Sequence, residues 1–222
     1  MDKIEALRKT ELFGSLNRAE LGSLSKVCVE RKLQKGQVLF HAGEASRGLF
    51  VIAQGALRAI RENPDGREQV IHIEKAGTTI AEVPVFDDRP YPSTVVAEED
   101  SSVLFISKAD VKGLCLKHPA IALSAVKLLA SRLRKTAALV ESLSLKEVDQ
   151  RLAAFLLREF TEKRLKKLKL PTHSVLAARL GSVREVVSRA FAKLENKGLI
   201  VVGKNRDAEI LDEKGLKLYA GE

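Results

Sequence analysis

Cysteine is scarce in this 222-residue chain. The two cysteines, Cys28 and Cys115, stand 87 residues apart, in no spacing typical of a zinc site or a disulfide scaffold. We therefore expect buried thiols in a reducing compartment. Two cysteines also cannot supply the four thiolates of an iron–sulfur cluster, so such a cluster is not expected within one chain.

Long apolar runs are missing as well. No segment approaches the roughly 18 consecutive apolar residues of a membrane-spanning helix, and the first six residues, Met-Asp-Lys-Ile-Glu-Ala, lack the apolar core of a signal peptide. We expect a soluble, cytoplasmic protein that does not bind a membrane. The sequence has no nucleophile–base motif, phosphate-binding glycine loop or histidine pair, so we expect neither an enzyme nor a metal site.

Positive charge is concentrated near the end of the chain. Residues 160–206 carry twelve Lys and Arg against three Asp and Glu, and the resulting +9 equals the net charge of the whole chain. A local excess of this kind predicts contact with nucleic-acid phosphates. The segment has no Tyr or Trp, and its Phe residues lie on apolar stripes, so it lacks the stacking surface used for single strands. Double-stranded DNA is therefore the expected partner.

The same basic segment has the pattern of two short helices around a turn. Thr172 is placed to cap a first helix, and Gly181 can end that helix with a positive φ. Ser182 and Glu185 have the spacing of a capping box at the start of a second helix, which ends at Gly198. This pattern is typical of a helix-turn-helix DNA-binding unit.

The second helix is predicted to expose a polar face at its N-terminal half. Its apolar positions recur at helical spacing, which leaves Arg184, Glu185, Ser188 and Arg189 exposed. Arginine can bond guanine N7 and O6, and glutamate can accept from cytosine N4, so this face suits a major groove. A merely solvated face with an ion pair is the alternative, and the local excess of charge disfavours it.

A short hairpin is predicted after the second helix. Leu199–Val202 and Ala208–Leu211 are β-prone, and Gly203–Asp207 forms a polar turn between them, which would make the unit a winged one. The tip of the hairpin is basic and could touch phosphate, although such a tip can also be only a soluble turn. The residues predicted to contact DNA are Thr172, His173, Ser182, Arg184, Glu185, Ser188, Arg189, Lys204 and Arg206.

Residues 33–107 predict an all-β domain of the jelly-roll or small-barrel type. Short apolar runs alternate with glycine-bearing turns, here including Gly48 and Pro64–Gly66. Such a domain can enclose a ligand or be filled by its own side chains. The predicted strands are Val38–Phe40, Leu49–Ile52, Leu57–Ile60, Val70–Ile73, Thr94–Val96 and Val103–Ile106.

A long helix is predicted from about residue 119 to residue 143. Its apolar residues follow a heptad repeat, which predicts pairing with a second copy of the helix, as DNA-binding dimers require. Packing of the same stripe against its own domain is the alternative. The residues predicted to form the dimer contact are Val126, Leu129, Leu133, Thr136, Val140 and Leu143.

With these elements in place, the chain resembles the bacterial Crp/Fnr transcription regulators over nearly its full length. The matching motifs are Lys35–Phe40 with Gly43-Glu44, Gly77–Glu82 with Phe86, Arg151–Ala154, Leu180–Arg189, Leu194-Glu195 and Gly198–Ile200. The resemblance implies an α+β chain with a cyclic-nucleotide-binding-like β-roll (1–118), a dimerisation helix (119–145) and a winged helix-turn-helix (146–222). It also implies a homodimer that binds promoter DNA and acts on RNA polymerase.

The resemblance also places an effector pocket in the β-roll. Cyclic-nucleotide-binding members carry an arginine ten residues after the pocket glutamate, where this chain has Pro92. A buried phosphate without a cationic partner is unfavourable, so we do not expect cyclic AMP to be the effector unless Arg89 or Arg132 supplies the charge. The pocket residues predicted from the resemblance are Ile80, Ala81, Glu82, Pro92, Ser93, Thr94, Leu133 and Thr136.

Two other kinds of sensing stay open at this point. The stretch Phe86–Thr94 resembles that of haem-dependent nitric-oxide responders, and the candidate axial ligands are His41, His72, His118 and the two cysteines. No two of these residues have the sequence spacing that would indicate a pair of haem ligands. The remaining possibility is a regulator that needs no ligand, with its pocket filled by side chains.

Overall fold

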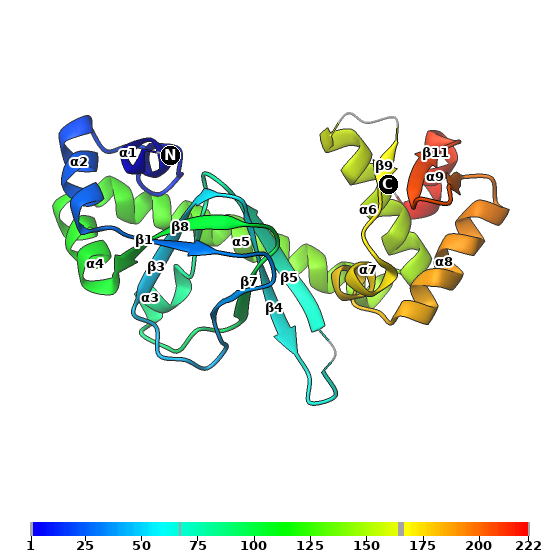
Figure 1. Cartoon of the computed structure of the whole chain (residues 1–222), viewed down its shortest axis with the longest axis horizontal. Helices are drawn as coiled ribbons and strands as arrows, with labels where there is room; N and C mark the ends of the chain where they lie inside the picture. The colour runs from blue at the N-terminus through cyan, green and yellow to red at the C-terminus, as the bar shows by residue number, and fades with distance from the viewer. Residues whose placement is uncertain (1, 67, 164–166, 222) are drawn as a thin grey trace. The chain divides into compact units, whose positions relative to one another are not determined.

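The computed structural model describes residues 2–66, 68–163 and 167–221, shown in Figure 1. The chain forms two compact units. The first comprises residues 1–61 and 71–136, and the second comprises residues 62–70 and 137–222. Within the described ranges, no single helix has both the length and the apolar composition needed to cross a membrane.

Two four-stranded sheets form a β-roll at the centre of the first unit. One sheet contains, in spatial order, β1 (Val29–Leu33), β8 (Ser101–Ser107), β3 (Gly48–Gln54) and β6 (Thr79–Ile80). The other contains β2 (Val38–Phe40), β7 (Thr94–Ala97), β4 (Ala56–Glu62) and β5 (Glu68–Lys75). The predicted β-roll is therefore confirmed, and each of the six predicted strands is present.

The apolar core of the roll lies between its two sheets. Phe40 stacks on Tyr91 with ring centroids 3.8 Å apart and on Phe50 at 5.7 Å. These rings pack with buried aliphatic residues from both sheets, among them Ile52 of β3 and Val95 of β7. Alternate residues of each strand point inward, as period-two patterning requires, so the core is built from the runs that predicted the strands.

Three helices cover the outer face of the first sheet. The helices α1 (Lys3–Arg8), α2 (Arg18–Val27) and α4 (Lys108–Lys117) bury a second apolar cluster against β3 and β8. The sequence analysis did not identify α1 or α2. A signal for α2 was present, since Asn17 and Glu20 form a reciprocal capping box at its start.

Gly48 does not form a turn, contrary to the sequence prediction. It is the first residue of β3 and pairs with Ser107 of β8. A Cβ atom at this position would lie 2.0 Å from the carbonyl oxygen of Ile106, so close backbone approach is what requires glycine here. Pro64–Gly66 does form a turn, with Gly66 at φ +76°.

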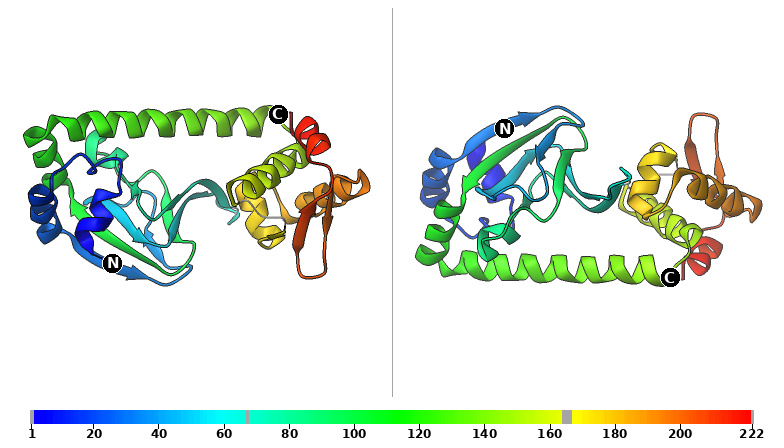
Figure 2. Two further views of the ribbon diagram at one scale, coloured as in Figure 1. Left: turned by 90° about the horizontal axis from the view of Figure 1, so that it is seen from above. Right: turned by 90° about the horizontal axis from the view of Figure 1, so that it is seen from below.

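The predicted long helix is present as α5 (Pro119–Leu145), which is continuous in Figure 2. Its heptad positions Val126, Leu133 and Val140 are 63%, 71% and 58% exposed. Leu129 and Leu143 are half-buried. One register of the predicted heptad therefore forms an exposed apolar stripe, while the other packs partly within the chain.

The second unit is a winged helix. Its helices are α6 (Val148–Lys163), α7 (His173–Leu180), α8 (Arg184–Asn196) and α9 (Glu213–Ala220). Its sheet has the order β10 (Ile200–Val202), β11 (Asp207–Ile210) and β9 (Leu168–Lys169), with antiparallel pairings. The predicted helix-turn-helix and hairpin are confirmed, whereas α6, β9 and α9 were not anticipated. The helices α6, α8 and α9 pack around one apolar core.

The close approach at Gly48 predicts a large and specific loss of stability. We expect Gly48→Ala to lower the free energy of unfolding by about 3 kcal/mol, because the added methyl group overlaps backbone that cannot move away. Gly113→Ala is the matched control. Gly113 lies in α4 with open space around it, so that variant should gain about 0.5–1 kcal/mol. Urea unfolding of both variants measures the difference, and equal stabilities would contradict the assignment of β3.

Candidate DNA interface and effector site

The two helices of the DNA-binding unit meet at a glycine turn. The hydroxyl oxygen of Thr172 accepts a hydrogen bond from the backbone N–H of Val175 at 3.4 Å and so caps α7. Gly181 ends α7 at φ +62°. The backbone N–H of Ser182 then donates to the carbonyl oxygen of Ala177 at 2.9 Å, which closes the turn.

The capping box predicted from Ser182 and Glu185 is wrong. The N-cap of α8 is Val183, which offers no capping side chain, and the Ser182 side chain is buried. The backbone N–H of Ser182 bonds the last turn of α7 and does not belong to the second helix. That helix therefore begins one residue later than the predicted capping box required. A buried Ser182 also does not fit its predicted contact with DNA. The N-terminus of α8 lacks a side-chain cap, and its positive end of the helix dipole favours an anion.

The other predicted residues of α8 lie where the sequence placed them. Arg184, Glu185, Ser188 and Arg189 are all exposed. The opposite face is buried in the core of the second unit through Val187, Ala190, Phe191 and Leu194. One helix thus presents two arginines and a glutamate outward while its apolar face fixes its orientation.

His173 and the hairpin tip complete the basic surface. The imidazole of His173 on α7 stacks on the Phe191 ring of α8 with centroids 5.2 Å apart. His173 is half-buried and therefore helps to pack the two helices together. Lys204 and Arg206 are exposed at the tip. Arg206 has φ +61°, and its carbonyl oxygen accepts from the N–H of Leu170, which ties the tip to the chain just before α7.

A polar network holds α8 to the helices behind it. The Asp149 carboxylate of α6 contacts the ammonium of Lys193 and accepts a hydrogen bond from the Tyr219 hydroxyl at 2.7 Å. Burial raises the pKa of Asp149, but the hydrogen bonds from Lys193 and Tyr219 outweigh this and keep the pKa below its ordinary value. Lys193 gains a raised pKa from the same partner. Three helices are thereby joined through one carboxylate.

In the first unit, Glu82 lies at the centre of the candidate effector site. It follows β6, is 0% exposed, and its Oε2 contacts Nη1 of Arg132 on α5. Nη2 of Arg132 donates to the carbonyl oxygen of Thr79 at 2.6 Å and lies 3.4 Å from Oε1 of Glu74. Burial raises the pKa of Glu82, and the guanidinium opposes part of that shift. Two carboxylates therefore share one arginine.

The remaining predicted pocket residues do not gather around Glu82 as one set. Ile80 and Ala81 are buried beside it, with Ala81 at φ +71°. The hydroxyl oxygen of Thr94 accepts from the N–H of Ala42 at 3.0 Å. Leu133 and Thr136 lie exposed on α5. It is Arg132, weighed in the sequence analysis only as a substitute cation, that reaches Glu82.

Arg61 is a second cation that the sequence analysis missed. Its Nη1 donates to the carbonyl oxygen of Pro92 at 2.6 Å. Pro92 stands where cyclic-nucleotide-binding members have an arginine, so a guanidinium lies beside that position even though this chain has proline there. Arg61 is on β4. It follows Ile60, which pairs with Thr94, and so lies opposite the two residues, Pro92 and Ser93, that lead into β7. Only strand pairing brings these residues together, since 31 positions separate them in the chain.

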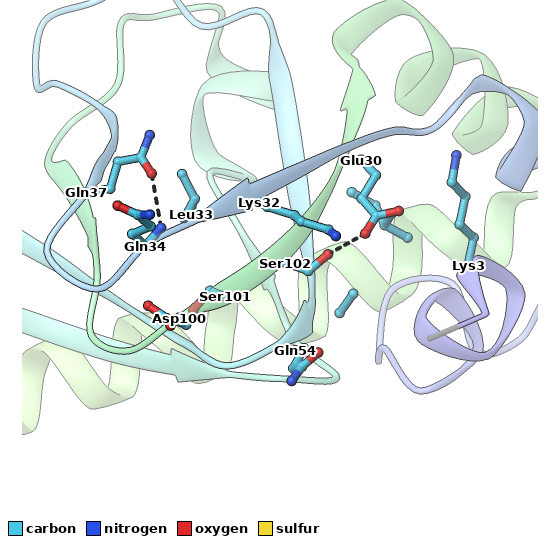
Figure 3. Close-up of a pocket in the computed structure, with 12 residues that line it drawn as sticks. Lys3, Glu30, Lys32, Leu33, Gln34, Gln37, Gln54, Asp100, Ser101 and Ser102 are labelled. Atoms are coloured by element: carbon cyan, nitrogen blue, oxygen red, sulfur yellow. Dashed lines mark hydrogen bonds between the residues drawn. The ribbon is translucent and has the colours of Figure 1, made fainter.

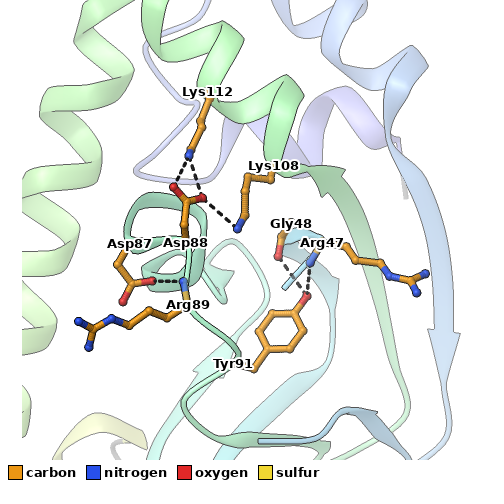
Figure 4. A network of polar contacts seen from close by, with 8 residues as sticks. All are labelled: Arg47, Gly48, Asp87, Asp88, Arg89, Tyr91, Lys108 and Lys112. Atoms are coloured by element: carbon orange, nitrogen blue, oxygen red, sulfur yellow. Dashed lines mark hydrogen bonds and ion pairs between the residues drawn. The ribbon is translucent and has the colours of Figure 1, made fainter. Parts of the chain in front are cut away.

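The segment between Glu82 and β7 is fixed by polar contacts, drawn in Figure 4. It begins with α3 (Val83–Asp87) and turns at Asp88, which has φ +58°. The Asp88 carboxylate bonds the ammonium groups of Lys108 and Lys112 on α4, and these bonds lower its pKa. Arg89 is exposed, its backbone N–H donates to Asp87 at 3.0 Å, and its guanidinium points away from Asp88 in the figure.

A groove on the outer face of the first sheet is separate from these residues. It has a volume of about 680 Å³ and is lined by mostly polar residues of β1, β3, β8 and the loops beside them, together with Lys3 (Figure 3). Within it the Ser102 hydroxyl donates to Glu30 at 2.9 Å, and Gln37 accepts from the N–H of Gln34 at 3.0 Å. These groups pair with one another and single out no ligand.

The candidate haem ligands differ in their surroundings. His41 is exposed, and Nδ1 of His118 lies 3.3 Å from Glu20. The Cys28 thiol contacts the carbonyl oxygen of Leu24, and burial raises its pKa to about 11, so it is not a thiolate at neutral pH. Burial also lowers the pKa of His72 to about 4, with further contributions from nearby cations of α5.

The low pKa of His72 predicts an acid-dependent loss of stability. Its folded-state pKa of about 4 lies below the ordinary value of about 6.5, so only the unfolded chain gains this proton as pH falls through that interval. We expect up to about 3 kcal/mol of unfolding free energy to be lost between pH 6.5 and pH 4. His72→Gln should flatten this dependence, and His41→Gln, at an exposed site, should not. Urea unfolding at several pH values measures both slopes, and parallel curves for wild type and His72→Gln would contradict the assignment.

Comparison with known proteins agrees with both units. The family model for the cyclic nucleotide-binding domain matches residues 30–118, and the model for the Crp-like helix-turn-helix domain matches residues 150–219. The cyclic AMP receptor protein of Thermus thermophilus is 28% identical over 211 residues, covering 93% of this chain and 97% of that protein. The fumarate and nitrate reduction regulatory protein of Vibrio cholerae is 28% identical over 215 residues, covering 93% and 85%.

A solved structure extends this agreement to three dimensions. A protein from Eubacterium rectale assigned to the Crp/Fnr family of transcriptional regulators superposes with a TM-score of 0.78 at 26% identity, covering 95% of this chain and 98% of that one. The β-roll, the winged helix and the two domain matches agree with one another. The chain belongs to the Crp/Fnr family of DNA-binding transcription regulators.

Proposed function

We propose that this chain is a homodimeric, sequence-specific regulator that binds promoter DNA through α8 and the β10–β11 hairpin. The observation that carries the proposal is the exposed Arg184, Glu185 and Arg189 face on a helix whose other side is buried. The proposed organisation is an effector domain at 1–118, a dimerisation helix at 119–145 and a DNA-binding domain at 146–222. We further propose a cytoplasmic location and RNA polymerase as the partner acted upon.

Charge and geometry both support DNA as the ligand of α8. The two arginines lie on the first two turns of the helix, where a recognition helix places its base-contacting side chains. Lys204 and Arg206 lie on the hairpin that follows α8 in the same unit. Their exposure and positive charge suit contact with the phosphate backbone beside the groove.

Dimerisation is supported by the exposed stripe on α5. Val126, Leu133 and Val140 recur every seven residues, and each leaves more than half of its surface open to solvent. Large aliphatic side chains at heptad spacing are stabilised when a second helix covers them. A second copy of the same helix supplies a matching stripe, and a symmetric dimer would then present two α8 helices to two half-sites.

We propose that the effector acts through the β-roll and that it is not cyclic AMP. Pro92 carries no charge to hold a cyclic phosphate, and the guanidinium of Arg132 is bound by two glutamates. An anionic ligand would have to displace a carboxylate from Arg132. A filled site of this kind also agrees with regulation that needs no ligand.

Haem is the second candidate for the effector. The observation that favours it is His72, whose imidazole is neutral at physiological pH and whose Nε2 is buried without a hydrogen-bond partner among the described residues. Neutral imidazole is a common axial ligand of haem iron. An absorption spectrum of the purified protein distinguishes this candidate, because bound haem gives an intense Soret band that His72→Gln would shift.

Base recognition by α8 predicts two different effects on DNA binding. Arg184→Ala and Arg189→Ala should each weaken binding to the cognate site by about 1–3 kcal/mol and reduce its preference over random DNA. Lys204→Ala should weaken both sequences about equally. Lys214→Ala removes the same charge from α9 and serves as the control. Fluorescence anisotropy with both DNAs measures this, and unchanged discrimination in both arginine variants would show that α8 does not contact bases.

The α5 stripe predicts the oligomeric state. The double variant Val126→Glu, Leu133→Glu should be monomeric and should bind operator DNA poorly, because charges at heptad positions cannot be buried between helices. Leu218→Glu adds a charge at a residue of α9 that is 82% exposed and should leave the dimer intact. Sedimentation equilibrium measures both, and a dimer of unchanged stability in the double variant would place the interface elsewhere.

The pocket chemistry predicts the response to cyclic AMP. Wild-type protein should bind it weakly, with little change in operator affinity, and Pro92→Arg should raise its affinity about tenfold by adding a bidentate contact to phosphate. Arg61→Ala tests the neighbouring cation and should leave the weak binding of wild type unchanged. Tight binding of cyclic AMP by wild type that Arg61→Ala abolishes would show that Arg61 supplies the charge. Calorimetry gives the affinities, and circular dichroism checks the fold of Pro92→Arg.

A further inference from the structure

A groove that the proposed function does not use lies in the second unit. It has a volume of about 850 Å³, and its lining residues come mainly from the end of α5, the start of α6, the C-terminal half of α8, and α9. All of these residues belong to the second unit. The packing of one compact unit therefore shapes the groove.

Three leucines make part of the groove apolar. Leu145 is 76% exposed and Leu218 is 82% exposed, which makes them the most exposed large apolar side chains among the described residues of the second unit. Leu199 lines the same groove and is buried. Single exposed leucines are common on soluble proteins. Two that line one groove with a third form an apolar surface that a second molecule can cover.

Two lysines of α8 lie beside these leucines over one aromatic ring. Nζ of Lys193 is 5.9 Å and Nζ of Lys197 is 5.5 Å from the centroid of the Tyr219 ring. The hydrogen bond from the Tyr219 hydroxyl to Asp149 fixes the ring. The ring attracts both ammonium groups and holds them near one place, so an anion that binds there orders little further side-chain motion.

The two lysines differ in their ionic partners. Lys193 contacts Asp149 and lies 3.6 Å from Glu147. Lys197 is exposed and forms no ion pair with another residue in the described part of the chain. It also belongs to the segment, residues 160–206, that carries a net charge of +9. Charge therefore favours an acidic group beside Lys197.

We propose that this groove binds an acidic segment of another protein, with aliphatic side chains against Leu145 and Leu218 and a carboxylate against Lys197. A protein segment suits the groove better than a small solute does, because the two exposed leucines stand on separate helices, α5 and α9. Several side chains of one segment can cover both leucines and still reach Lys197.

The proposal goes beyond the proposed function, because the groove is separate from the positions proposed to contact bases. Lys197 stands 13 positions after Arg184, which corresponds to about 20 Å along a helix axis. The second protein and DNA can therefore bind at the same time. Binding in the groove also does not depend on base recognition by α8.

Three short fluorescein-labelled peptides test the class of ligand. The first contains only Leu and Glu, the second has Lys in place of each Glu, and the third has Ala in place of each Leu. With full-length wild-type protein, we expect anisotropy to give a dissociation constant for the first peptide at least about tenfold lower than for either of the others. Equal affinities for the three peptides, or no binding of the first, would overturn the proposal.

Substitutions locate the bound peptide. Lys197→Gln and Leu218→Ser should each weaken binding of the Leu and Glu peptide about fivefold or more, because each removes one of the two proposed kinds of contact. Lys204→Gln removes the same charge from the hairpin tip, and Leu116→Ser removes a leucine of α4 that is 85% exposed, so neither control should change the affinity. Equal losses in Lys204→Gln and Lys197→Gln would place the peptide on the basic DNA surface and overturn the proposal. The comparison of the three peptides needs no variant, so it stands even if a variant fails to fold.

Two further measurements identify a different occupant of the groove. Lys197→Gln should leave operator affinity within about threefold of wild type, and a larger loss would make Lys197 a phosphate contact and overturn the proposal. Sedimentation should show no assembly larger than a dimer. A larger assembly that Leu218→Ser dissolves would show that a second copy of the chain fills the groove. Failure of the wild-type protein to bind operator DNA would refute the proposed function and leave the peptide results unaffected.

Discussion

The carboxylate of Glu82 must be neutralised because it is buried, and that constraint organises the first unit. Its counter-ion, Arg132, lies on α5, so the ion pair joins the β-roll to the helix that follows it. Removal of Arg132 would leave the Glu82 carboxylate buried without a counter-ion, which typically costs about 3–5 kcal/mol. The same arginine is shared with Glu74. The site that would sense an effector is therefore also a structural contact of α5, the helix that carries the exposed heptad stripe.

In the second unit, packing and one ion pair hold the arginine-bearing surface of α8 in one orientation. Apolar burial of Phe191 and Leu194 fixes one side of α8, and the contact between Lys193 and Asp149 fixes it to α6. The positions proposed to contact bases can then stay polar and exposed without loss of stability. Packing and the proposed recognition use opposite faces of a single helix, so substitutions on the exposed face should change DNA preference while the core is kept.

Elements with strong periodicity or turn chemistry were predictable from the sequence. The strands of the β-roll and the α7–α8 pair combine apolar spacing with glycine residues in their turns, and α5 has apolar residues at heptad spacing. The strand β1 (Val29–Leu33) was missed because four of its five residues are exposed and three of them are charged. Ser182 was misassigned because the residues of a capping box also fit a turn that closes the preceding helix.

The sequence by itself determined the family, the helix-turn-helix and the residues that face outward on α8, because these follow from local spacing and charge. Tertiary structure alone decided which oxygen each of two guanidinium groups meets. Arg132 is 50 positions from Glu82 and Arg61 is 31 positions from Pro92, and no local pattern announces either pair. Strand pairing and helix packing place such residues together, and the low solvent exposure they create at Arg132 and Glu82 makes that pairing energetically decisive.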